Sequence, residues 1–165
     1  MRSSILFLIF STLLFSSTVS AKPKIKQCSN RQASELKDIR SYLKKNLKTI
    51  MKSVSDLTDK EKKRLKKKVK NINFKCLDDK KVCKDHNRYG MSRHLFKTAI
   101  VICYDYHRRH GDEAYCELTD TVLHEIAHAS RVEKSDPHKA GDRVWRVGRA
   151  ARKLCRKNNL DRALK

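Results

Sequence analysis

Proline, acidic residues and long apolar runs are all scarce in this chain of 165 residues. The only two prolines are Pro23 and Pro137, and neither internal repeats nor low-complexity linkers are present, so nothing in the composition indicates a second domain. Beyond the first 21 residues, no apolar run approaches the length of about 20 residues that a transmembrane helix needs. The sequence therefore predicts a single domain, with no transmembrane segment after removal of its N-terminal run.

That N-terminal run has the features of a secretory signal peptide. Arg2 supplies the positive start, residues 5–15 form the apolar stretch, and Val19-Ser20-Ala21 offers the small side chains of a cleavage site. We expect residues 1–21 to be removed and the mature protein to be secreted or periplasmic.

All six cysteines follow the predicted cleavage site. An even number of cysteines in an exported chain predicts a disulfide framework, here of three bridges whose pairing the sequence leaves open. No C-x-x-C pair occurs, which makes zinc ligation by cysteine the weaker interpretation. The predicted disulfide residues are Cys28, Cys76, Cys83, Cys103, Cys116 and Cys155.

The shortage of acidic residues gives the chain an unusual charge. It has 18 Asp and Glu against 40 Lys and Arg, a formal net charge of +22. The excess is concentrated in two blocks, Lys60–Lys70 and Arg143–Arg156. A charge run usually marks a solvated helix face, but an excess this large favours an anionic partner: nucleic acid, lipid headgroups, an acidic wall polymer or an acidic protein.

The first half of the mature chain, residues 22–75, reads as a basic helical part. Apolar residues recur at intervals of three and four from Ser29 to about Val54, which predicts an amphipathic helix. Thr58 and Glu61 have the spacing of a capping box and predict the start of a second, very basic helix.

The remaining residues, 76–165, are expected to form the core that carries the chemistry. Residues 72–93 are polar and predict irregular structure held by disulfides, whereas Lys97–Tyr104 has the Ile and Val content of a strand. Residues 104–115 predict a charged loop. One of its tyrosines, or Tyr89, is a candidate hydrogen-bond donor to an oxyanion, although a surface loop is the plainer interpretation.

The most informative motif is His124-Glu125-Ile126-Ala127-His128, an H-E-x-x-H pentad. Residues four apart lie on one face of a helix, so both imidazoles can reach one metal ion. Glu125 then lies beside that metal, where it can accept a proton from a zinc-activated water. The pentad predicts His124 and His128 as Zn²⁺ ligands and Glu125 as the catalytic general base.

The surrounding residues predict a buried helix for this motif. It is expected to begin between Cys116 and Asp120, with Thr119 or Asp120 as the cap. The alternative is a core helix whose histidines only satisfy local hydrogen bonds. A broad apolar stripe borders the histidines and consists of Leu118, Val122, Leu123, Ile126, Ala129 and Val132.

A catalytic zinc site needs a third protein ligand. We rank His138 first, Asp136 second and Asp142 third, because all three follow the pentad near a turn and the predicted start of another helix. That helix is expected to run from about His138 to Cys155. The plainer alternatives are a capping role for Asp136 and an exposed turn position for His138.

The order of a strand (residues 98–103), the pentad helix, a turn and another helix resembles the zincin metallopeptidases. The deuterolysin and lysine-specific metallo-endopeptidase group, the aspzincins, is the closer in pattern, and this resemblance implies an aspartate ligand such as Asp136. Ala140 stands where that group has a tyrosine. The SprT-like group is second, with Trp145 in place and Gly141 where its histidine would stand, so the branch stays open.

Taken together, these patterns predict a mainly helical α+β domain of zincin type, with a small sheet and disulfide staples. The expected function is that of a secreted, monomeric zinc metallopeptidase that cleaves peptide or protein substrates, some of them on an anionic surface. Two alternatives remain: an exported cationic binding protein with an inert pentad, and a cell-wall peptide amidase.

Overall fold

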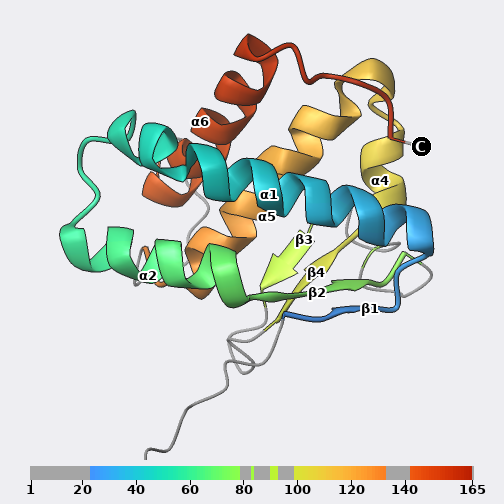
Figure 1. Cartoon of the computed structure of the whole chain (residues 1–165), viewed down its shortest axis with the longest axis horizontal. Helices are drawn as coiled ribbons and strands as arrows, with labels where there is room; N and C mark the ends of the chain where they lie inside the picture. Colours follow the sequence, from blue (N-terminus) through green and yellow to red (C-terminus); the bar gives the residue numbers. More distant parts are fainter. Residues whose placement is uncertain (1–22, 79–82, 84–89, 93–98, 133–141, 165) are drawn as a thin grey trace, which may run out of the picture.

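The computed structural model describes residues 23–78, 83, 90–92, 99–132 and 142–164. Within them, helices gather over one small sheet (Figure 1). The elements are β1 (Ile25–Lys26), α1 (Asn30–Lys52), α2 (Asp59–Asn71), β2 (Asn73–Cys76), β3 (Gly90–Ser92), β4 (Ala99–Ile102), α4 (Tyr104–Arg108), the 3-10 helix η1 (Gly111–Glu113), α5 (Ala114–Ala129) and α6 (Arg143–Lys157).

The sheet has four strands in the order β1-β2-β4-β3. The first three strands are parallel, with Phe74 of β2 opposite Ile100 of β4, and the helical connection α1–α2 joins β1 to β2. Strand β3 pairs antiparallel with β4, with Met91 opposite Val101. Because β4 is its only strand neighbour within the described residues, β3 forms one edge of the sheet.

Helix α1 begins where the sequence predicts. The Ser29 side chain accepts a hydrogen bond from the backbone N–H of Gln32, and the Gln32 side chain bonds back to the Ser29 N–H. These reciprocal bonds satisfy amide groups that the first helical turn leaves without partners. Leu36, Ile39 and Leu43 are fully buried on the inner face of the helix.

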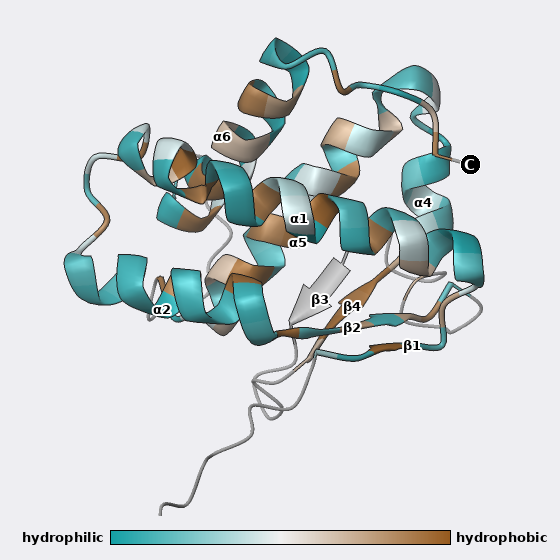
Figure 2. Cartoon of the chain, viewed as in Figure 1, coloured by the Kyte–Doolittle hydropathy of each residue, from teal (hydrophilic) through white to brown (hydrophobic). Residues whose placement is uncertain are grey.

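Helix α2 also confirms its predicted start, since Thr58 and Glu61 form the expected capping box. Its buried apolar residues, Leu65 and Val69, lie on one side, and the rest of the helix is hydrophilic (Figure 2). The thin apolar stripe is enough to hold α2 in place because α2 packs against both α1 and α5.

A single hydrophobic core contains residues from both the N-terminal and the C-terminal parts of the chain. Leu36 and Leu65 belong to the same buried cluster as Leu123 and Val147. Three disulfides join distant segments, and the predicted class of a mainly helical, disulfide-stapled α+β domain is confirmed. None of the helices described here is long and apolar enough to cross a membrane.

Two segments differ from their predicted structure. Residues 72–93 are not wholly irregular, because they contain β2 and β3; the alternation in β2 buries Phe74 and Cys76 but is too short to stand out in the sequence. Residues 104–115 are not a loop, because they contain α4 and η1. The apolar strand predicted at Lys97–Tyr104 is confirmed, although β4 is shorter than predicted.

The two helices around the predicted site begin elsewhere than expected. Helix α5 begins at Ala114, so Thr119 and Asp120 are inside the helix rather than at its cap. The Thr119 hydroxyl donates to the carbonyl oxygen of Tyr115 instead. Helix α6 begins at Arg143, five residues after His138, because Asp142 has extended backbone angles and caps it.

Candidate metal centre

The pentad lies in the last turns of α5, as predicted. The Nε2 atoms of His124 and His128 are 3.1 Å apart, and the two ring planes meet at 79°. Both imidazoles are half-buried, and Glu125 between them is buried, with 7 % of its surface exposed. The helix therefore turns two ring nitrogens toward one point and keeps the carboxylate of the motif in a sheltered position.

This separation is compatible with a shared metal ion. Two nitrogens that bind one tetrahedral zinc at about 2.0–2.1 Å are themselves about 3.3 Å apart. Two neutral imidazoles at 3.1 Å can also share one proton in a hydrogen bond, so the distance permits either state. The donor set of His124 and His128 fits zinc, which prefers imidazole nitrogen and tolerates carboxylate oxygen.

Of the three predicted third ligands, the structure describes only Asp142. His138 and Asp136 lie outside the described part of the chain. Asp142 is described, and its carboxylate accepts a hydrogen bond of 2.7 Å from the backbone N–H of Trp145, which gives it the role of helix cap. Within the described ranges, no group of three His, Cys, Asp or Glu side chains is placed to hold a metal.

Helix α6 packs directly along α5 (Figure 1). The Trp145 ring meets the His124 ring edge-on, with centroids 5.5 Å apart. One turn further along, a Cβ added to Gly148 would lie 3.1 Å from the Cβ of His124 and 3.1 Å from the carbonyl oxygen of Asp120. Glycine at this position therefore lets the two helices approach closely at the level of the first histidine.

Asp120, predicted as a possible helix cap, instead lies inside α5 beside the histidines of the motif. It lies one turn before His124 on α5, against Gly148, and its side chain is 15 % exposed. Burial raises its pKa from 3.8 to about 6, although Arg152, 3.5 Å away, opposes the shift. The spacing of Asp120, His124 and His128 at intervals of four was the sequence signal that these residues share a face.

The disulfide Cys116–Cys155 joins α5 to α6 and holds the two helices together. Of the other two bridges, Cys28–Cys76 ties the segment before α1 to β2. Cys83–Cys103 ties Cys83 to the residue directly after β4. All cysteines of the chain are paired in these bridges. Their oxidised state agrees with an oxidising compartment, where such bridges persist.

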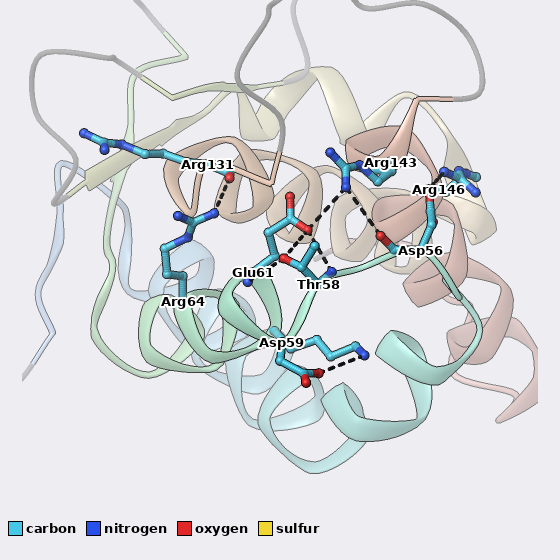
Figure 3. Close-up of polar contacts among 9 residues, drawn as sticks. Asp56, Thr58, Asp59, Glu61, Arg64, Arg131, Arg143 and Arg146 are labelled. Atoms are coloured by element: carbon cyan, nitrogen blue, oxygen red, sulfur yellow. Dashed lines mark hydrogen bonds and ion pairs between the residues drawn. The ribbon is translucent and has the colours of Figure 1, made fainter.

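Helix α2 holds the ends of the two site helices (Figure 3). Arg64 donates from Nη2 to the carbonyl oxygen of Arg131, 2.6 Å away, just after α5. Glu61 lies 3.3 Å from Arg143, the first residue of α6. A third contact, from Arg146 to Asp56 at 2.5 Å, connects α6 to the turn before α2.

The tyrosines expected in the 104–115 segment have different surroundings. The Tyr104 hydroxyl is buried and donates to the Glu35 carboxylate, which together with burial raises the pKa of Tyr104. Tyr115 is buried under the guanidinium of Arg162. Tyr106 is half-buried on α4, and Tyr89 lies outside the described residues. Tyr104 and Tyr115 are thus used in the core rather than at the histidines.

No protein-family model matches this chain, and the searches of curated proteins and of solved structures likewise returned no significant match. The geometry of α5 and its neighbours is therefore what points to a function.

Proposed function

We propose that this chain is an exported zinc metallopeptidase that hydrolyses peptide bonds. The observation that carries the proposal is the convergence of the His124 and His128 Nε2 atoms, 3.1 Å apart, on a helix whose intervening Glu125 is buried. A zinc ion held there would lower the pKa of water toward neutrality and polarise the scissile carbonyl.

In this mechanism Glu125 accepts a proton from the attacking water and passes it to the leaving amine. Two residues of α6 limit the positions open to the His124 side chain. The Trp145 ring contacts the imidazole edge-on, and the backbone at Gly148 lies close to the Cβ of His124. Fixed ligands reduce the reorganisation that metal binding and catalysis require. The third ligand is proposed to be His138, with Asp136 as the alternative of the aspzincin branch.

The sheet edge offers a place for an extended substrate. Strand β3 is an edge strand within the described residues, and it packs near α5. A peptide that adds to this edge would make backbone hydrogen bonds to β3, and its carbonyl groups would run along the helix that carries the pentad. Such pairing recognises the peptide backbone, which agrees with a peptidase.

The decisive experiment combines zinc content with cleavage. The oxidised protein is expected to hold one zinc per chain and to cleave an unfolded protein substrate. A Glu125→Gln variant should keep its zinc and lose at least about 10²-fold in kcat, because only the proton transfer is removed. His124→Ala should lose zinc and activity together. His110→Ala, which changes a half-buried histidine immediately before the 3-10 helix η1, serves as the control.

Cleavage by Glu125→Gln at the rate of the unchanged protein would contradict the mechanism. A zinc-loaded protein that cleaves wall peptides but no protein substrate would favour the amidase alternative. His138→Ala and Asp136→Ala variants then identify the third ligand. Zinc binding should weaken by a factor of about 10 or more only in the variant that lacks the true ligand.

A further inference from the structure

The two basic blocks of the sequence have different roles in the structure. The arginines of α6 are engaged in ion pairs within the protein: Arg146 with Asp56, Arg152 with Glu117, and Arg156 with Asp161. Their charges hold α6 to α5, to the α1–α2 turn and to the C-terminal segment. They are therefore largely compensated before any partner approaches.

Four lysines of α2 are not used in this way. Lys60, Lys63, Lys67 and Lys70 are exposed, and no ion pair within the described residues involves them. At 100° per residue these four positions lie within about 60° of the direction opposite to Leu65 and Val69, the buried side of the helix. We call these four residues the lysine row.

The dimensions of the lysine row are those of a helix face. Lys60 and Lys70 are ten positions apart, so at about 1.5 Å per residue the row is about 15 Å long. Helix α1, which packs against α2, also carries exposed lysines. They are Lys44, Lys45, Lys48 and Lys52.

The residue types of α2 limit the partner. The helix contains no aromatic residue on which a base could stack, and its only apolar residues, Leu65 and Val69, are buried, so it has nothing to insert into a bilayer. Lysine is a point charge without the planar fork that reads base edges. Along one strand of a nucleic acid duplex a charge occurs every 3.4 Å or so, which places about four phosphates along about 15 Å.

We propose that the lysine row binds the phosphate backbone of a nucleic acid duplex, without sequence preference. The row faces away from the inner side of α2, which packs against α5. The duplex and the metal centre would therefore use different faces of the protein. Binding at the lysine row would be independent of zinc and of Glu125.

The test compares two variants of equal charge. The row variant carries Lys60→Gln, Lys63→Gln, Lys67→Gln and Lys70→Gln, and glutamine keeps a helix propensity close to that of lysine. The control variant carries Lys24→Gln, Lys26→Gln, Lys153→Gln and Lys157→Gln, which removes the same charge from exposed positions outside α1 and α2. Circular dichroism and thermal melting confirm the fold of both.

Binding of a mixed-sequence DNA duplex is measured by fluorescence anisotropy over a range of salt concentrations. The slope of log Kobs against log salt should become shallower by about 3.6 in the row variant, at about 0.9 per lost phosphate contact. The control variant should keep the slope of the unchanged protein. Two half-row variants, Lys60→Gln with Lys63→Gln and Lys67→Gln with Lys70→Gln, should each change the slope by about 1.8.

Equal losses in the row and control variants would overturn the proposal, because they would show that net charge alone attracts the duplex. Binding to vesicles rich in phosphatidylserine that exceeds duplex binding, with the same dependence on the lysine row, would also overturn it and assign the row to a membrane surface. Retained duplex binding in the presence of a zinc chelator is the expected result.

Discussion

Arg143 places its guanidinium 3.3 Å from the carboxylate of Glu61, although the two residues are 82 positions apart. The Glu61 carboxylate is buried and also accepts hydrogen bonds from the backbone N–H and the hydroxyl of Thr58. The contact connects the first turn of α2 to the first residue of α6. A helix that carries no metal-binding motif thus holds the first turn of a site helix in place.

We expect Glu61→Ala to lower the free energy of unfolding by about 2 kcal/mol, because it removes the capping box and leaves Arg143 without this partner. Urea unfolding measures the loss. Asp59→Ala removes an exposed carboxylate from the same turn and should change stability little, since its ion pair with Lys62 is in solvent. Equal effects of the two substitutions would show that the Glu61 contact contributes nothing specific.

Gly148→Ala should both destabilise the protein and weaken zinc binding. The added methyl group meets Asp120 and the Cβ of His124, so the two helices must separate, at a cost of about 1–3 kcal/mol. Gly111→Ala is the control: its φ of 54° makes alanine strained by about 1 kcal/mol, but open space surrounds it. Zinc titration should separate the two, with a lower affinity only for Gly148→Ala.

Replacing both Cys116 and Cys155 by alanine should cost about 4 kcal/mol, as the loop entropy of a 39-residue separation predicts. The shorter Cys83–Cys103 loop, of 20 residues, should cost about 3 kcal/mol when removed in the same way. Because only the first bridge joins α5 to α6, zinc affinity should fall more in the first double variant. The opposite order of zinc affinities would contradict this role.

Asp120 should give the metal-free protein a distinct pH dependence. Its pKa is raised from 3.8 to about 6 by burial, so the folded state binds the proton more tightly than the unfolded state. Protonated Asp120 therefore contributes stability below about pH 4, and this contribution is lost as the pH rises to about 6, on the order of 3 kcal/mol in all. Asp120→Asn should not show this loss.

Urea unfolding of both proteins between about pH 4 and pH 7 measures that difference. The stability of the unchanged protein should fall relative to Asp120→Asn across the range. A constant difference would mean that Arg152 holds the Asp120 carboxylate ionised throughout, with the ion pair outweighing burial.

Local features were predictable because neighbours in the sequence produce them. A helix cap depends only on residues about three positions apart, and the predicted capping box of Thr58 with Glu61 is confirmed, as is the helix start at Ser29. The start of α5 was misplaced because Thr119 and Asp120 are good capping residues that packing buried inside the helix. Strand β2 was missed because its alternation covers too few residues to be distinguished from a polar loop.

The sequence by itself determined that this protein is a basic, mainly helical, disulfide-bearing domain, and that His124, Glu125 and His128 share a stretch of helix, because helical spacing is a local property. Only the tertiary structure decided the pairing of the cysteines, the close approach of α6 at Gly148 and the use of the α6 arginines in internal ion pairs. These depend on contacts between residues distant in the chain, whose energies arise only when the core brings them together.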